Sequence, residues 1–351
     1  MFLYLLEILE KLLLLRGASG EEFPVLRWIA DFLEDCGFED IYWQEYDPGK
    51  WNLYARRGSS PFLFATHVDV HYAGRPTGFS LRDGFVFGAG VLDTRGQIAA
   101  LLDAVQRTTS PVELVFFSEE ETTGAGSWHF EPHKPFEGAI VLEPTSFSLC
   151  TALAGDVEVR FTVEGLSGHG AYPHAAQNAI ALAMEIIRRC REIVAACAAH
   201  PLFLPPLELM LGRIEGGESS YVVPERCVLE CALPFPPPHG VEEMKEKVLA
   251  LEREYPVRVT FLDANPAFSI PCENPVVKRL EDAIKWVEGK GVVYAGMPSW
   301  TDATYLAMRG VPSVVFGAGD LALAHSEREC VSLEELERLR EVFLSFLGST
   351  V

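Results

Sequence analysis

The amino-acid sequence predicts an α/β protein in which a second, smaller domain interrupts the first. Over about the first 150 of the 351 residues, apolar strand-like runs alternate with helical segments, which is typical of a sheet covered on both faces. From residue 156 the order becomes β-α-β-β-α-β, the order of a ferredoxin-like α+β unit. A later helix and the apolar run at 311–319 indicate a return to the first domain. We therefore expect one domain at 1–155 and 264–351, with a second domain at 156–263 inserted into it.

Two helices are expected at the start of the chain. The run MFLYLLEILEKLLLLRG is apolar, but Glu7, Glu10 and Lys11 interrupt it and it is too short to span a bilayer. It therefore predicts a buried amphipathic helix. The letters SGEE at 19–22 fit a capping box that begins a second helix, and Gly37 is expected to end that helix.

The remaining elements of the first domain follow from their apolar pattern. A helix is expected at 94–108, and the continuous apolar strands indicate a central mixed, largely parallel sheet. The expected strands are DIYWQEY (40–46), WNLYARR (51–57), PFLFATHVDV (61–70), VELVFFS (112–118) and GAIVLE (138–143).

The inserted domain is predicted from six segments in the ferredoxin-like order. These are a strand at 157–165, a helix at 175–197, strands at 207–217 and 221–233, a helix at 241–254 and a strand at 257–262.

Composition narrows the classes of partner and the compartment. With 29 basic and 50 acidic residues, the net charge of -21 repels phosphate backbones and anionic lipid surfaces, so neither nucleic acid nor a membrane is expected as a partner. The eight cysteines form no CxxC pair and lie mostly in apolar stretches, which favours buried free thiols. We expect a cytoplasmic protein, because free thiols persist in a reducing compartment.

Acidic and imidazole residues stand at the ends of several predicted core strands. Three adjacent carboxylates, Glu119 to Glu121, follow one strand, and their mutual repulsion indicates either a solvated acidic turn or a bound cation. His67 ends another strand, and Asp69 lies two residues on, on the same face, where it could accept the N–H of a metal-bound imidazole. Asp93 lies among glycines before a helix, where it could equally be an N-cap.

Two further residues extend this pattern. Glu143 ends a third apolar strand and His325 follows a glycine-rich turn. Ligands of α/β sheets bind outside the carboxyl ends of the strands, so these groups are expected to converge on one crevice. Two histidines and several carboxylates suit zinc or a similar ion, and two such ions about 3.5–4 Å apart require a bridging carboxylate.

In order along nearly the whole chain, six motifs resemble those of one enzyme family. The family is the di-zinc metallopeptidases and deacylases that include acetylornithine deacetylase, succinyl-diaminopimelate desuccinylase, aminoacylase and glutamate carboxypeptidase. The motifs are THVD (66–69), GAGVLDTRG (88–96), SEEETTGAGS (118–127), LEPTS (142–146), GLSGHGAYPHAAQNAI (165–180) and FGAGDLALAHSEREC (316–330).

The resemblance implies a role for each matching residue. His67 and Glu143 would hold one zinc ion, Glu121 and His325 the other, and Asp93 would bridge the two. Cobalt or manganese could substitute for zinc.

It also implies roles outside the metal ligands. Glu120 would be the general base, and Asp69 would orient His67. In relatives, the histidine that matches His169 reaches the active site of a partner subunit and stabilises the oxyanion, which implies a homodimer and a lid role for the inserted domain. Six other histidines match no ligand position: His71, His129, His133, His174, His200 and His239.

The substrate-binding segment departs from the family pattern. Relatives commonly have Asn where this chain has Tyr221, and the Arg that they carry a few residues later is absent from ECALPFP (230–236). Arg213 or Arg226 could compensate. The identity of the acyl-amino acid is therefore open.

The expected activity is hydrolysis of the amide bond of a small N-acyl amino acid, as by acetylornithine deacetylase in amino-acid biosynthesis. Alternatives with the same chemistry are a desuccinylase, a hydrolase that frees lysine or ornithine from a carrier protein, and a dipeptidase or carboxypeptidase. Two other classes remain: an inactive binding homologue, and an α/β protein whose acidic strand ends are solvated loops without metal.

Overall fold

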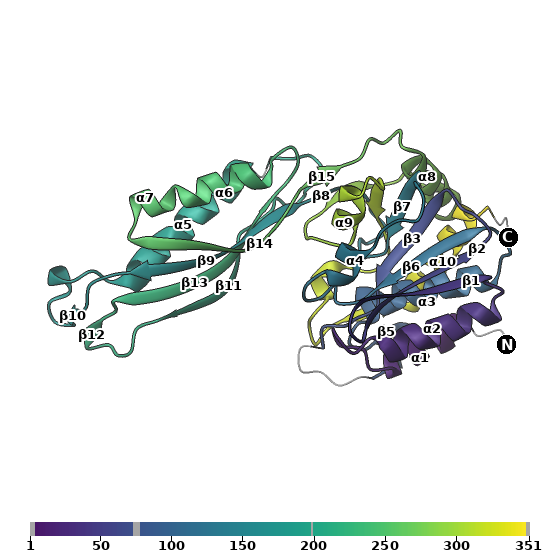
Figure 1. Ribbon diagram of the computed structural model, residues 1–351, viewed down its shortest axis with the longest axis horizontal. Helices are drawn as coiled ribbons and strands as arrows, with labels where there is room; N and C mark the ends of the chain where they lie inside the picture. The colour runs from purple at the N-terminus through teal and green to yellow at the C-terminus, as the bar shows by residue number, and fades with distance from the viewer. Residues whose placement is uncertain (1–3, 73–77, 198, 349–351) are drawn as a thin grey trace. The chain divides into compact units, whose positions relative to one another are not determined.

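The computed structural model describes residues 4–72, 78–197 and 199–348, and the chain forms two units. Unit 1 contains the chain up to Thr151, Ile270–Tyr294 and the chain from Thr301 onward. Unit 2 contains Ala152–Ser269 and Ala295–Trp300, so it is formed by the middle of the sequence (Figure 1).

A mixed sheet of nine strands organises the fold in the described residues. Its order is β1-β2-β6-β3-β7-β17-β8-β15, and β16 pairs with β8. The strands are β1 (Asp40–Asp47), β2 (Lys50–Arg57), β3 (Phe62–His67), β6 (Val112–Phe117), β7 (Gly138–Val141), β8 (Leu149–Leu153), β15 (Phe268–Ser269), β16 (Tyr294–Met297) and β17 (Ser313–Val315).

The mixed sheet is confirmed, and its central strands β6, β3, β7 and β17 form a parallel group. The pairings β1–β2, β2–β6, β17–β8 and β8–β15 are antiparallel. Between β1 and β2 the connection is too short for a crossover, which forces a hairpin. Strands β3 and β6 are buried along their whole length, as expected for strands covered on both faces.

The helices of unit 1 cover this sheet. Five of them, α1 (Leu5–Leu14), α2 (Phe23–Asp35), α3 (Gly96–Gln106), α8 (Pro275–Glu288) and α10 (Leu333–Phe346), contribute to the large apolar core. The short helices α4 (Ala125–His129) and α9 (Ala303–Met308) contact each other, and α9 packs on β17. The N-terminal helix is amphipathic as expected, with Ile8, Leu9 and Leu12 buried and Glu7 exposed.

A second sheet of three short strands and a π-turn complete unit 1. The strands are β4 (Ser80–Arg82), β5 (Phe85–Phe87) and β18 (Cys330–Ser332), and the turn is η1 (Val91–Arg95).

The predicted capping box at the start of α2 is wrong. The helix begins after Glu22, which has helical dihedral angles and makes no side-chain cap. The Ser19 hydroxyl instead donates to Asp69 Oδ2 at 2.7 Å, and Glu22 Oε1 accepts from the Gly20 and Glu119 amides. Both side chains therefore form hydrogen bonds with residues far along the chain, Asp69 and Glu119. Gly37, at φ +76°, follows the end of the helix as expected.

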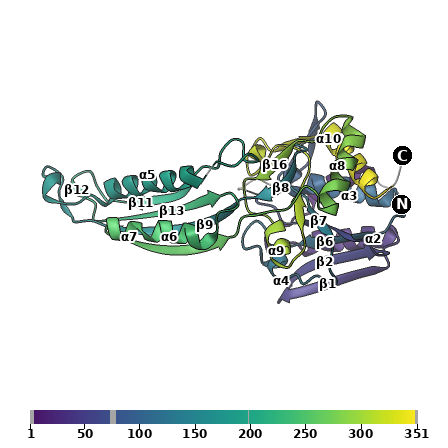
Figure 2. The same cartoon turned by 90° about the horizontal axis from the view of Figure 1, so that it is seen from above.

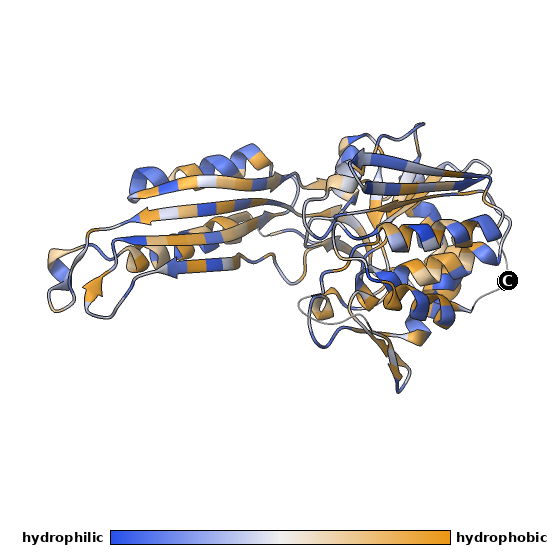
Figure 3. Cartoon of the chain, turned by 60° about the horizontal axis from the view of Figure 1, so that its bottom comes forward, coloured by the Kyte–Doolittle hydropathy of each residue, from blue (hydrophilic) through white to orange (hydrophobic). Residues whose placement is uncertain are grey.

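Unit 2 has the predicted ferredoxin-like order. Its antiparallel sheet runs β11-β13-β9-β14, and its helices pack over one face around a separate core. Buried and solvent-facing residues alternate along β9 and β13, and the hydropathy colouring alternates along the same strands (Figure 3). Its elements are β9 (Gly155–Glu164), α5 (Ala179–Cys197), β11 (Met210–Gly216), β13 (Arg226–Phe235), α6 (Val241–Leu249), α7 (Leu251–Glu254) and β14 (Val257–Asn265). Figure 2 shows β11, β13 and β9 of this sheet side by side.

All eight cysteines are free, and five are buried, whereas Cys272 is exposed, contrary to expectation. Among the described residues no helix combines the length and apolar character needed to cross a bilayer.

Candidate active site

The candidate residues of unit 1 follow the carboxyl ends of the parallel strands. His67 is the last residue of β3, Glu119–Glu121 follow β6, and Glu143 lies two residues beyond β7. These three strands are neighbours and run parallel, so their carboxyl ends meet at one edge of the sheet. Residues far apart in sequence are brought together in this way.

Two groups of potential metal ligands share Asp93. His67, Asp93 and Glu143 each offer an atom within 4.8 Å of the others, and so do Asp93, Glu121 and His325. The Nε2 atom of His67 lies 3.0 Å from Asp93 Oδ1, and that of His325 lies 3.3 Å from Oδ2. The two oxygens of one carboxylate therefore face different histidines, which is the placement of a bridging ligand.

The turn that carries Asp93 depends on a glycine. Gly90 has φ +77°, and a Cβ there would lie 2.4 Å from Val70 Cγ2, so a larger residue does not fit. The peptide bond between Asp93 and Thr94 is cis, and the Thr94 hydroxyl donates to the His67 carbonyl at 2.8 Å. The turn is thereby attached to the end of β3.

Asp69 contacts both His67 and the glutamate loop. His67 Nδ1 lies 3.1 Å from the Asp69 carbonyl oxygen and 3.4 Å from its carboxylate Oδ1. The same carboxylate accepts from the backbone amides of Glu120 and Glu121 at 3.1 and 3.0 Å. Burial opposes its ionisation, but the hydrogen bonds from His67 and Ser19 prevail and lower the pKa of Asp69.

The three adjacent glutamates have different surroundings. Glu119 is in the left-handed region at φ +60°, and its carboxylate accepts from Lys50 Nζ at 2.7 Å and from the Tyr46 hydroxyl at 2.9 Å. Glu121 lies 2.9 Å from His325 Nε2. Glu120 approaches His67 Nε2 at 4.0 Å. The three side chains therefore point toward different partners.

The carboxylates in the site lack enough positive charge from the protein. Burial, and then the charge of Asp93, raise the pKa of Glu143 well above its ordinary value, and Glu143 Oε1 has no hydrogen-bond partner. Burial also raises the pKa of Glu120. Hydrogen bonds to Asp93 and Glu121 raise the pKa of His325 to about 10. Such a set of buried anions calls for a cation.

This burial contradicts the interpretation of the strand ends as solvated loops. His67 is 0% exposed, Glu143 3% and Asp93 7%. Because an uncompensated buried carboxylate is costly, these side chains are not an ordinary acidic surface turn.

Two residues at the site were not identified from the sequence. The His71 amide donates to Glu121 Oε1 at 3.2 Å, and its ring centroid lies 5.0 Å from that of His325. Asp302 precedes α9 but does not cap it, and burial raises its pKa to about 7. Its charge also raises the pKa of Glu120 and Glu143. The two-residue spacing of positions 67, 69 and 71 could have indicated His71 from the sequence. Asp302 gave no such signal, because an aspartate before a helix is usually interpreted as a helix cap.

His169 belongs to unit 2 and is exposed there. It lies in the two-residue strand β10 (Gly168–His169), which pairs with β12 (Val222–Val223), and its Nδ1 accepts from the Ala171 amide at 3.1 Å. Tyr221, at 78% exposure, immediately precedes β12. His169 thus lies in this small ribbon, and Tyr221 is next to it in sequence. Arg213 forms ion pairs with Glu215 and Glu230.

Comparisons with known proteins agree with this architecture. Residues 63–349 match the sequence model described as peptidase family M20/M25/M40. The acetylornithine deacetylase of Vibrio campbellii is 28% identical, with 89% of this chain and 88% of that protein covered. The succinyl-diaminopimelate desuccinylase of Marinobacter nauticus is 25% identical, with 97% of each covered.

Solved structures share the fold. A tripeptidase from Staphylococcus aureus has a TM-score of 0.81 at 18% identity, covering 98% of this chain and 96% of that one. A metallo-carboxypeptidase from Sulfolobus solfataricus has a TM-score of 0.78 at 14% identity, covering 98% of both chains. Because the family match extends over most of the sequence, the chain belongs to peptidase family M20/M25/M40 and is an enzyme that hydrolyses amide bonds.

Proposed function

We propose that the enzyme releases an amino acid from a small N-acyl form, as acetylornithine deacetylase does, with two zinc ions and Glu120 as the general base. The observation that carries this proposal is the position of Asp93 between two histidine–carboxylate groups. The similarity to deacetylases and desuccinylases along most of both chains supports the acyl-amino acid class.

The residues fit a pair of divalent ions. His67 and Glu143 would hold one ion, and Glu121 and His325 would hold the other. Asp93 would bind both ions. Imidazole nitrogen and carboxylate oxygen are ordinary zinc ligands. The Glu143 Oε1 atom, which is buried and accepts no hydrogen bond, is an acceptor that an ion would satisfy. Two ions held there would polarise the scissile carbonyl and lower the pKa of an attacking water. Cobalt or manganese would serve as substitutes.

Glu120 is the carboxylate suited to proton transfer. It comes from the same turn as Glu121, but it is not paired with His325, and burial keeps its pKa well above the ordinary value. A base with a raised pKa can take the proton of the attacking water and later give it to the departing amine. Asp69 fixes the orientation of His67 and, through two amides, the position of Glu120.

Unit 2 is assigned the roles of lid and dimer contact. Strand β11 is the edge of its sheet and is exposed along its whole length, with Leu211 and Ile214 at 42% and 53% exposure. An exposed apolar edge strand favours pairing with another chain. His169 would then assist at the active site of a second subunit, and Tyr221 beside it would contribute to substrate choice.

The same site would serve the closest alternatives. A desuccinylase is supported by the relative of that name. Dipeptidase, carboxypeptidase and carrier-protein-linked hydrolase activities require only a different leaving group. The acidic surface disfavours an acidic carrier protein, and Tyr221 in place of Asn disfavours the ordinary desuccinylase. We place the reaction in cytoplasmic amino-acid biosynthesis.

The test is an assay of the zinc- or cobalt-loaded enzyme against N-acetyl, N-succinyl and peptide-linked amino acids. Chelation should abolish turnover, and readdition of zinc should restore it. Turnover of an acyl-amino acid with higher kcat/KM than any dipeptide is the expected outcome. A metal-loaded protein that turns over no member of the panel would favour the inactive binding homologue.

Adjacent glutamates provide a matched pair of variants for the base. Glu120→Gln should lower kcat by about 10²–10⁴-fold, because it removes general-base catalysis. Glu119→Gln should leave kcat near that of the wild type, since Glu119 pairs with Lys50 and Tyr46. Equal losses in the two variants, or near-normal turnover by Glu120→Gln, would assign the base elsewhere.

A further inference from the structure

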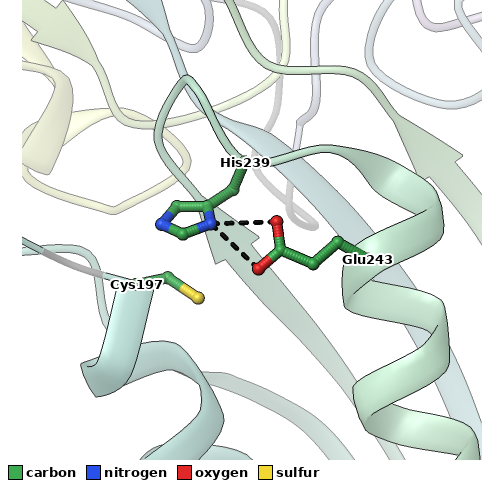
Figure 4. A group of neighbouring side chains, drawn as sticks. All are labelled: Cys197, His239 and Glu243. Atoms are coloured by element: carbon green, nitrogen blue, oxygen red, sulfur yellow. Dashed lines mark hydrogen bonds and ion pairs between the residues drawn. The ribbon is translucent and has the colours of Figure 1, made fainter.

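Unit 2 contains a second group of metal-binding side chains, which the hydrolytic site does not use. Cys197 ends α5, His239 precedes α6 and Glu243 lies in the first turn of α6. Each offers a ligand atom within 4.8 Å of the other two, and Figure 4 shows the three side chains facing a common point. We call these three residues the α5–α6 cluster. All of them lie within one unit.

We propose that the α5–α6 cluster binds a zinc ion that ties the end of α5 to the start of α6. Thiolate, imidazole and carboxylate are the three side-chain ligand types of protein zinc sites. Zinc bonds of about 2.0–2.3 Å in a tetrahedron place neighbouring donors about 3.3–3.8 Å apart. The spacing of up to 4.8 Å therefore has to close by only about 1 Å, which small side-chain rotations provide.

The charges already present favour a cation at this point. Lys247 Nζ lies 3.3 Å from Cys197 Sγ and 2.6 Å from Glu243 Oε1, so an ammonium of the protein contacts two of the three ligands. His239 Nδ1 lies 3.1 Å from both oxygens of Glu243. A bound ion would replace the Lys247 ammonium, whose side chain can turn toward solvent.

The cluster is closed on one side and open on the other. Cys197 is 3% exposed, and the fully buried Met244 places its Sδ 3.7 Å from Cys197 Sγ. The side chains of His239 and Glu243 are 29% and 44% exposed. An ion can therefore enter past His239 and Glu243 and meet a sulfur at the back, which excludes the harder ions magnesium and calcium.

Cobalt(II) provides a test that distinguishes this cluster from the hydrolytic site in the full-length enzyme. The candidate ligands in unit 1 contain no sulfur, so a thiolate-to-cobalt charge-transfer band in the near ultraviolet reports cysteine ligation alone. We expect one more bound equivalent of cobalt or zinc than the hydrolytic site takes, together with this band. Affinity should rise with pH, because binding releases the thiol proton.

Four variants decide the assignment. Cys197→Ser should remove the band. His239→Ala and Glu243→Gln, which change partly exposed side chains, should weaken binding by at least about 100-fold, since even outer partners of a ligand are worth about 10–100-fold. Lys247→Met should bind about fivefold more tightly, because the ion no longer displaces an ion-paired ammonium.

Some outcomes would overturn the proposal. These are absence of the charge-transfer band, its persistence in Cys197→Ser, and unchanged affinity in both His239→Ala and Glu243→Gln. Any of them would show that these side chains only contact Lys247 and one another and bind no metal ion. Amide hydrolysis by His239→Ala should equal that of the wild type. The proposal can thus fail while the hydrolytic function stands, and the reverse is also true.

Discussion

At the scale of single residues, neighbouring carboxylates acquire different chemistry from their surroundings. The left-handed backbone at Glu119 turns its side chain toward Lys50 and Tyr46. Glu120 and Glu121 follow with amides bound to Asp69, and their side chains meet different histidines. Three chemically identical groups therefore differ in their contacts because the backbone separates them.

The Asp69→Asn variant tests how much the site depends on this anchor. An amide has one acceptor oxygen and an NH₂ group, so it cannot accept from both Glu120 and Glu121 amides and still bind His67. We expect metal affinity, measured by chelator competition, to fall by about 10–100-fold. Ser19→Ala removes only one donor and should have a smaller effect. Unchanged affinity in Asp69→Asn would rule out its orienting role.

At the scale of elements, close contacts between segments set the position of the glutamate loop. A Cβ on Gly126, in α4, would lie 2.4 Å from the Ser118 carbonyl at the end of β6. Asn52 of β2 donates to the Gly126 carbonyl at 2.8 Å. The strand, the loop and the short helix are thus packed as one piece, which fixes the region around Glu120.

In unit 2, the start of β9 carries a pH-sensitive contact. Asp156 pairs in register with Asn265 of β14, whose Nδ2 donates to it at 3.1 Å, and burial raises the pKa of Asp156 from 3.8 to about 6. A carboxyl whose pKa is higher in the folded state contributes stability that is complete below pH 3.8 and is lost as pH rises through 6.

Asp156→Asn should remove this dependence. The raised pKa corresponds to at most about 3 kcal/mol of unfolding free energy. We expect the melting temperature of the variant, relative to wild type, to increase between pH 4 and pH 7, as followed by circular dichroism. The exposed Asp282→Asn serves as the control and should show a constant difference. A constant difference for Asp156→Asn as well would refute the assignment.

At the scale of the whole molecule, unit 1 and unit 2 each have a large hydrophobic core of their own. Unit 1 holds the converging strand ends, and unit 2 supplies an independent sheet with an exposed edge. The chain belongs to a family of amide hydrolases, and the proposed dimer would use that edge.

Ile214→Lys tests the proposed dimer. Ile214 lies on β11 and is 53% exposed, so a charge there should block pairing between edges without disturbing the core. We expect a monomer by analytical ultracentrifugation under conditions where the wild type is a dimer. The matched change Trp286→Lys, in the exposed part of α8, should leave the dimer intact. A dimer in both variants would place the contact elsewhere.

The sequence by itself determined the elements whose pattern is local. Apolar runs and their period predicted the α/β class, the amphipathic α1 and the ferredoxin-like order of unit 2. A helix or strand that buries one or both faces needs apolar residues at a fixed local spacing, so its pattern is visible in consecutive residues. Motifs in order along the chain indicated the family.

Only the tertiary structure decided how distant residues meet. It placed His71 and Asp302 at the site. It also showed that Ser19 donates a hydrogen bond to Asp69 and does not cap a helix, and that Glu119 pairs with Lys50. It also decided which neighbouring strands are parallel, β6, β3, β7 and β17, and which pairings are antiparallel, such as β1–β2 and β2–β6. Hydrogen bonds and ion pairs between segments far apart in sequence form only when the chain is folded. The local spacing of residues therefore does not predict them.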